Sequence, residues 1–243
     1  SCSSTGYQLV KWVMDVNLPE VGRVDMSYND IPVFRIAEMY LIYAEALAEH
    51  SSYAVTQDDI DISINKIRDR VGMPHLKIGG LTADPYLTDP KYGYTNPILL
   101  ADSDLALILE IRRERAVELF KEGFRWDDLM RWKEGKVFEQ EFIGMYIPGA
   151  GAYDLNSDGT ADVNIATATN AGNPGSGATT FKIGDNLNFA GTDTEKGNLT
   201  MHKDIKREWK EDRDYLYPIP TKDRILTNGA LTQNPGWDDK LGL

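Results

Sequence analysis

The sequence predicts a mainly α-helical fold with long irregular loops and a few short strands. Three segments, within residues 32–49, 58–72 and 102–122, carry apolar side chains at the three- and four-residue spacing of helices. Residues 144–200 differ in composition, because they hold 10 of the 21 glycines of the chain. We therefore expect a single domain over residues 1–243, with a glycine-rich loop excursion over its surface at about 144–200.

The length and charge of the chain limit the kinds of protein and partner that it can represent. A chain of 243 residues can bury a sizeable core, and it contains no apolar run long enough to span a membrane. The formal net charge is -12, from 38 acidic and 26 basic residues. Such a charge repels phosphate backbones, so we do not expect a nucleic-acid partner. It is compatible with neutral ligands such as glycans, and with cations.

The first helix is expected between Pro32 and about Glu49, after a strand-like run at Tyr7–Val16 and a loop. Its polar positions form one narrow stripe, which predicts a helix buried on most sides. Several alanines would let neighbouring helices approach closely. This character is typical of stacked helical hairpins.

A second helix is expected from an Asp58 cap to Val71, where Gly72 and Pro74 end it. The loop over residues 73–100 then carries three tyrosines. A third helix is expected from a cap at Asp102 or Ser103 to Glu122. After the break at Gly123 the sequence predicts a short helix at Arg125–Trp132, and later a short strand at Tyr215–Tyr217, a helical turn at Lys222–Leu226 and a tail held by Trp237.

The third helix is dense in charge. Glu110 and Arg113 lie three positions apart, as do Arg115 and Glu118, so opposite charges can meet on its surface. Two of its carboxylates could form an acid/base pair, but we favour ion pairs that support the fold. Arg112 or Arg115 would then pair with Glu38 or Glu45 of the first helix.

One local motif predicts a calcium site. The run D-L-N-S-D-G-T-A-D places oxygen ligands at alternate positions and a glycine at the sixth, where a calcium loop must turn sharply. The loop departs from an EF-hand at its twelfth position, where Ile165 replaces the usual glutamate. The alternative is a run of Asx turns without metal. The expected ligands of a structural calcium ion are Asp154, Asn156, Asp158, Thr160 through its carbonyl, and Asp162.

No sequence motif predicts an enzyme. The three histidines, His50, His75 and His202, lack ligand spacing, and the motifs of zinc proteases, serine hydrolases and nucleotide-binding loops are absent from the sequence. Aromatic residues are more informative, because the C–H faces of sugars stack on aromatic rings. The loop tyrosines are therefore the candidate ligand-binding residues, with the alternative that they hold their own loops to the helical body: Tyr86, Tyr92, Tyr94, Tyr146 and Tyr153.

Five segments in a fixed order resemble the SusD/RagB family of nutrient-binding outer-membrane proteins of the Bacteroidetes. They are R-I-A-E-M-Y-L-I-Y-A-E-A (35–46), I-N-K-I-R-D-R-V-G-M-P (64–74), I-R-R-E-R-A-V-E-L-F-K-E-G-F-R-W-D-D-L-M-R-W (111–132), Y-P-I-P (217–220) and L-T-Q-N-P-G-W (231–237). The resemblance covers residues 6–137 and 213–238. It implies a TPR-related helical fold and a protein that is not an enzyme.

The resemblance also implies a place and a partner. Family members are lipid-anchored on the outside of the outer membrane, where they bind glycans or other nutrients and deliver them to a SusC-like TonB-dependent transporter. An alternative role is a helical scaffold that mainly contacts the transporter or sister lipoproteins. Since complete members are about twice as long, we expect this chain to match their C-terminal part, without the N-terminal TPR-like half and its lipid anchor. The first helix would then expose an apolar patch.

Overall fold

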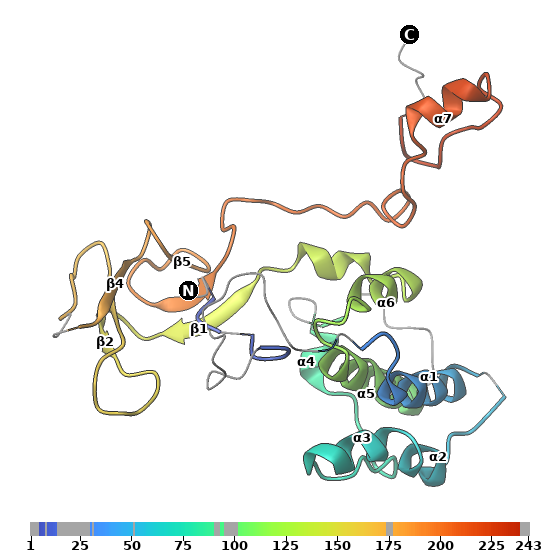
Figure 1. Cartoon of the computed structure of the whole chain (residues 1–243), viewed down its shortest axis with the longest axis horizontal. Coiled ribbons are helices and arrows are strands. Elements are labelled where there is room, and N and C mark those ends of the chain that lie inside the picture. The colour runs from blue at the N-terminus through green and yellow to red at the C-terminus, as the bar shows by residue number, and fades with distance from the viewer. Residues whose placement is uncertain are drawn as a thin grey trace. The chain divides into compact units, whose positions relative to one another are not determined.

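In the computed structural model the chain divides into two compact units, a helical unit and a strand unit (Figure 1). The helical unit comprises Trp12–Phe138 and Glu208–Leu243, and the strand unit comprises Ser1–Lys11 and Glu139–Arg207. The described residues are 5–7, 9–13, 30, 32–50, 52–89, 93–94, 102–173 and 177–238, without the side chains of 102–104. They are 32% helical and contain seven α-helices beside two small sheets, so the mainly α prediction is confirmed only in part.

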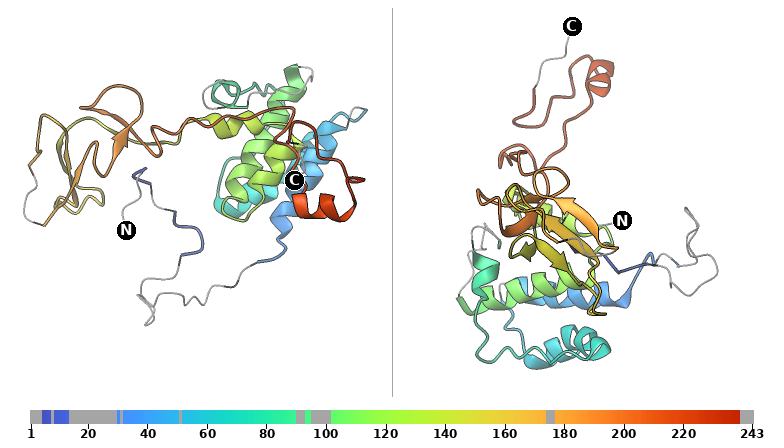
Figure 2. Two further views of the ribbon diagram at one scale, coloured as in Figure 1. Left: turned by 90° about the horizontal axis from the view of Figure 1, so that it is seen from above. Right: turned by 90° about the vertical axis from the view of Figure 1, so that its left-hand side faces the viewer.

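Helices α1 (Ile36–Glu49) and α5 (Asp102–Glu118) form the centre of the helical unit, where they run side by side (Figures 1 and 2). The buried residues of α1 include Ala37, Leu41 and Ala44, which face α5 and α3 (Ile64–Val71). The opposite face is exposed at Ile36, Met39, Ile42 and Tyr43. The expectation that this helix is buried on most sides is therefore wrong, because its neighbours cover one face, whereas the expected exposure of apolar side chains is confirmed.

The second expected helix is divided into two. Helix α2 (Gln57–Asp61) begins after Thr56, whose hydroxyl and backbone form a capping box with Asp59. The chain then leaves helical geometry at Ser63, whose hydroxyl donates to the Asp59 carbonyl over 2.5 Å. The prediction of one continuous helix capped by Asp58 is therefore wrong, because a serine side chain takes a backbone acceptor at the break. The predicted end at Gly72 is confirmed, with the left-handed φ of 69°.

The remaining helices of this unit are short. Helix α4 (Pro85–Thr88) starts with an Asp84 cap, and α6 (Arg125–Arg131) follows the break at Gly123. Helix α5 ends four residues earlier than expected, since the backbone at Lys121 is left-handed, with a φ of 63°. The 3-10 helix η1 (Gly135–Glu139) follows α6. None of the described helices is both long enough and apolar enough to span a bilayer.

The C-terminal segment is held by side-chain amides and an indole. The strand expected at Tyr215–Tyr217 is absent, because the carbonyls there accept from side chains instead of from a neighbouring strand. Trp237 Nε1 donates to the Leu216 carbonyl over 2.8 Å, which confirms the expected attachment of the tail. Helix α7 (Thr221–Leu226) confirms the expected helical turn.

The strand unit contains two three-stranded sheets. One sheet has the order β1 (Ile143–Ile147), β6 (Gly197–Thr200), β5 (Asn188–Phe189) and is antiparallel throughout. The other has the order β2 (Gly151–Tyr153), β3 (Val163–Ala166), β4 (Thr179–Lys182), with β3 and β4 parallel. They share one apolar cluster, formed by Ile147, Ile165, Leu187, Phe189 and Leu199.

These sheets lie in the segment that the sequence predicts to be a loop excursion. The prediction of an irregular segment at 144–200 is wrong, because the six strands of the two sheets lie within residues 143–200. The sequence pattern does not reveal them, since strands of two to five residues are too short to show a period. Of the strand-like run at Tyr7–Val16, the described residues 7 and 9–13 form a turn and irregular chain outside any strand, and the rest lies outside the described residues. The assignment of the whole chain to one domain stays a prediction.

Candidate functional site

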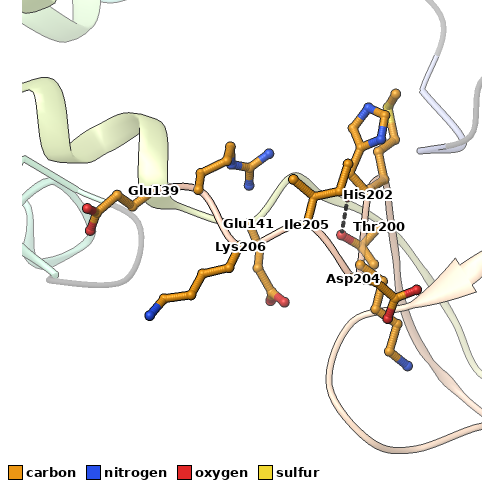
Figure 3. A pocket seen from close by; sticks show the side chains of 10 residues that line it. Glu139, Glu141, Thr200, His202, Asp204, Ile205 and Lys206 are labelled. Carbon is orange, nitrogen blue, oxygen red and sulfur yellow. Dashed lines mark hydrogen bonds between the residues drawn. The ribbon is translucent and has the colours of Figure 1, made fainter. Parts of the chain in front are cut away.

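The strand unit contains a pocket of about 400 Å³, which is the candidate ligand site (Figure 3). Two segments form it, one where η1 leads into β1 and one where the chain leaves β6. The β1–β6 ladder brings them together, because Ile143 lies opposite Thr200. The pocket is lined by Glu139, Glu141, Thr200, Met201, His202, Lys203, Asp204, Ile205, Lys206 and Arg207.

Local contacts fix the shape of the second segment. His202 has a left-handed φ of 56°, and its carbonyl accepts a 2.9 Å hydrogen bond from the Ile205 amide. Further along, Arg207 Nη2 donates to the Gln140 carbonyl, and its guanidinium lies 4.5 Å over the Phe142 ring. Arg207 therefore ties the end of the second segment to the first segment.

The lining of the pocket carries balanced charge. Three carboxylates, Glu139, Glu141 and Asp204, face three cations, Lys203, Lys206 and Arg207. Figure 3 shows the side chains of Glu141, Asp204 and Lys206 extending to the same side of the two segments, whereas His202 extends to the other. Carboxylate oxygens accept hydrogen bonds, and ammonium and guanidinium groups donate them. Such a lining can bind hydroxyl groups in both roles.

Sequence reasoning did not select these pocket residues. The available signal was the run H-K-D-I-K-R at 202–207, in which three cations and one carboxylate surround one apolar residue. A run of this kind is usually a solvated surface. The other side of the pocket, which carries Glu139 and Glu141, is about sixty residues away in the sequence. Only the pairing of β1 with β6 therefore reveals the site.

The predicted tyrosines are divided between the two units, with Tyr86 and Tyr94 in the helical unit and Tyr146 and Tyr153 in the strand unit. Tyr86 lies exposed on α4 and Tyr146 lies exposed on β1. Tyr94 is buried against Trp132 and Arg112, and the Tyr153 hydroxyl donates to the Gly149 carbonyl over 2.6 Å. These contacts support the alternative that Tyr94 and Tyr153 hold their own loops. Tyr92 lies outside the described residues.

The predicted calcium loop is a network of Asx turns in this structure. The Asp154 carboxylate accepts from the amides of Ser157 and Gly159 at 2.6 and 2.7 Å. Asp158 accepts from the Thr160 amide at 2.8 Å, Asn156 accepts from the Asp158 amide at 2.9 Å, and Asp162 accepts from the Leu155 amide at 2.8 Å. The hydrogen bond from the Gly159 amide is the main reason that the pKa of Asp154 is lowered.

The carboxylates of this loop do not converge on one point. Among the described residues, no group of three or more His, Cys, Asp or Glu side chains is arranged to hold a metal ion. The Asx turns correspond to the metal-free alternative for this loop, and a carboxylate keeps spare lone pairs when it accepts one N–H. Calcium binding here therefore stays a prediction.

The charged residues of α5 act in ion pairs that join helices. Arg113 pairs with Glu110 at 2.5 Å, as predicted. The closest partners of the other two arginines differ from the prediction: Arg115 binds both Asp128 oxygens at 2.7 and 2.9 Å, and Arg112 lies 3.5 Å from Glu134 and 3.8 Å from Glu49. Both arginines interact with the predicted Glu45 only through longer-range electrostatics. Glu118 pairs with Arg70 at 2.7 Å and also with Arg35. The structure therefore favours a supporting role for these residues.

The comparisons with known proteins give one match. The family model described as the SusD family matches residues 2–237, which is essentially the whole chain. No curated protein and no solved structure matches the chain.

Proposed function

The chain belongs to the SusD family, and from this premise we propose that it binds a glycan or another nutrient at the outer cell surface and delivers it unchanged to a SusC-like TonB-dependent transporter. Proteins of this family bind nutrients or glycans in outer-membrane uptake systems. The family match over residues 2–237 is the observation that carries the proposal. A lipid anchor on the cell-surface side of the outer membrane would place the protein beside its transporter.

The pocket of the strand unit supplies the chemistry that this role requires. Its volume of about 400 Å³ lies in the range of small-ligand sites. Sugar hydroxyls both donate and accept hydrogen bonds, and the lining offers carboxylate acceptors and cationic donors. The formal charges of the six acidic and basic lining residues cancel, and the chain has a net charge of -12, so a neutral glycan fits better than a polyanion.

Isothermal titration calorimetry against maltoheptaose, xylohexaose, cellohexaose and mannohexaose tests the proposal. We expect at least one oligosaccharide to bind, and Glu141→Gln together with Asp204→Asn to weaken its binding about tenfold, because a charged hydrogen bond is worth about 1.5–3 kcal/mol. Asp185→Asn is the matched control, since this exposed carboxylate lies in the same unit outside the pocket lining. Binding of none of the sugars would contradict the glycan proposal.

The proposal also states that the cargo leaves unaltered. Incubation of the protein with the bound oligosaccharide should give no new reducing ends. Release of shorter sugars at a rate above that of buffer would identify an enzyme and refute the binding role.

The exposed face of α1 favours the alternative role as a scaffold. Ile36, Met39, Ile42 and Tyr43 expose 40–66% of their surface on consecutive turns of one helix. Contiguous apolar residues of this kind are typical of protein contacts. Pull-down with the transporter distinguishes the two roles: Met39→Glu should abolish the contact in a scaffold and leave it intact in a protein that acts through its pocket.

A further inference from the structure

An aromatic cluster in the helical unit resembles neither a buried core nor an ordinary surface. Its members come from α6, η1 and the segment after Glu208, and they are Trp126, Phe138, Trp209, Tyr215 and Tyr217. The ring centroids of Trp126 and Phe138 lie 4.9 Å apart, and those of Trp209 and Tyr215 lie 5.1 Å apart. Contacts of this kind stabilise the orientation of each ring beyond the area that they bury.

Two of these rings are open to solvent. Tyr217 is 73% exposed and Trp126 is 40% exposed, and their ring planes are stacked at 29° with centroids 6.5 Å apart. The rings therefore form an aromatic platform, defined here as Trp126 and Tyr217 supported by Phe138 and Trp209.

The support beneath the platform is specific. Trp209 contacts both Trp126 and Phe138, at centroid distances of 6.3 and 5.6 Å. Its indole lies directly on the backbone of Gly135, where an added Cβ would be 2.0 Å from the ring. The Tyr215 hydroxyl accepts a 3.1 Å hydrogen bond from the Gly135 amide and donates one of 2.9 Å to Glu211. The chain thus lacks a side chain at the one position where the supporting indole needs room.

A hollow of about 390 Å³ adjoins the platform. Trp126 forms part of its wall, together with Leu119, Phe120 and Phe124 from the segment between α5 and α6. The buried ion pair of Arg115 with Asp128 also lines it. Lys121 and Arg125 are its other charged residues, and the rest of the lining is apolar, so the hollow combines an apolar surface with a small number of polar groups, as small-molecule sites do.

The flanks of the platform are polar. Arg125 and Asp127 are exposed on either side of Trp126 in α6, and the exposed Glu211 lies beside Tyr215. This combination selects the occupant. A purely apolar partner would remove these charged groups from water without replacing their bonds to it, and a polyanion would meet the net charge of -12. A pyranose ring meets both requirements, because its C–H face covers an aromatic ring while its hydroxyls reach the polar rim.

We propose that the aromatic platform and its hollow form a second carbohydrate contact, which binds one face of a neutral pyranose ring on Trp126 and Tyr217. The ligand class rests on the proposed function, but the location is independent of the pocket lined by Glu141 and Asp204. Sugar stacking on Trp126 should change the indole fluorescence, whereas binding at the pocket, whose lining contains no tryptophan, need not.

Tyr217 can be substituted with little effect on the fold, because most of its ring is exposed. The hydrogen bond from Asn234 goes to the backbone carbonyl of Tyr217 and is kept in any variant. Tyr217→Ala removes the ring and Tyr217→Phe retains it. With the oligosaccharide that binds in the calorimetric panel, we expect about tenfold weaker affinity and a reduced fluorescence change in Tyr217→Ala, and near wild-type values in Tyr217→Phe. Phe34→Ala, which removes another highly exposed ring of the helical unit outside the platform, should bind as wild type.

The outcomes separate the two proposals. If Tyr217→Ala binds as tightly as wild type with an unchanged fluorescence signal, while the Glu141→Gln, Asp204→Asn variant binds more weakly, the platform inference is overturned and the pocket stands. If only Tyr217→Ala loses affinity, the platform stands and the pocket does not. If no oligosaccharide binds to the wild-type chain, both fail.

Discussion

Trp132 donates a 2.6 Å hydrogen bond from its indole Nε1 to Oε1 of Glu45, and so joins the end of α6 to the centre of α1. Arg131 binds the same carboxylate, at 2.6 Å through Nη2. Burial raises the pKa of Glu45, but the hydrogen bonds from Arg131 and Trp132 outweigh it and lower the pKa below its usual value. Glu45 is therefore a charged residue that the helical unit stabilises in its interior.

Removal of this carboxylate should be costly. In Glu45→Ala the Trp132 N–H and the Arg131 guanidinium lose their acceptor, so we expect the free energy of unfolding to fall by about 2–4 kcal/mol. Glu45→Gln keeps one acceptor oxygen and should lose less. Urea denaturation measures both, with the exposed Glu208→Ala as control. Equal stability of Glu45→Ala and wild type would show that this network does not hold α1 to α6.

The capping box of α2 predicts an acid transition. Hydrogen bonds from the Thr56 hydroxyl and backbone, and then from Tyr53, lower the pKa of Asp59 to about 2. The unfolded value is near 3.9, so this carboxylate stabilises the fold above pH 4, and the stabilisation is lost as the pH falls through about 2.

Variants of this box test the sign of the effect. Thr56→Ala removes the leading donor, so the pKa of Asp59 should rise and the loss of stability should begin at higher pH. Tyr53→Phe should act in the same direction with a smaller shift, because its hydroxyl donates only one of the hydrogen bonds, at 2.8 Å. Carboxyl chemical shifts followed by NMR report the pKa directly. An unchanged titration in Thr56→Ala would contradict the assignment.

Sequence alone predicted the parts of this fold that local patterns determine. The end of α3 at Gly72 follows from its left-handed backbone, and the start of α6 at Arg125 follows from the break at Gly123. The prediction of the N-cap of α2 was less accurate, because Thr56 and Asp58 are both good N-cap residues. Only the reciprocal hydrogen bonds with Asp59 select Thr56.

The strand unit and the pocket could not be predicted in this way. Strand β5 has two residues and β3 pairs in parallel with β4 across a glycine-rich connection, so no window of sequence contains the pattern. The closest partners of Arg115 and Arg112 could not be predicted either, since spacing along α5 shows which charges share a face but not which helix packs against it.

The two faces of α1 provide a matched pair of substitutions. Leu41 is fully buried, and its truncation should lower the free energy of unfolding by about 2–5 kcal/mol. Met39, two residues earlier in the same helix, is 45% exposed, and Met39→Ala should change stability by less than about 1 kcal/mol. Both substitutions place alanine in the same helix, so the helix propensity of the new residue is the same in the two variants. Thermal or urea unfolding then compares their losses of stability directly. Equal losses would mean that the face with Met39 is covered in solution.

The loop Asp154–Asp162 gives a prediction for calcium. If the ion binds, the carboxylates of Asp154, Asp158 and Asp162 turn from their Asx hydrogen bonds toward one centre, and the melting temperature rises with added Ca²⁺ by mass action. Asp158→Ala should abolish this rise, whereas Asp185→Asn, an exposed carboxylate elsewhere in the strand unit, should leave it unchanged. Differential scanning calorimetry with and without EDTA measures the effect. Identical melting curves under both conditions would establish the loop as a run of metal-free Asx turns, stabilised by the hydrogen bonds from the amides of Ser157 and Gly159 to Asp154.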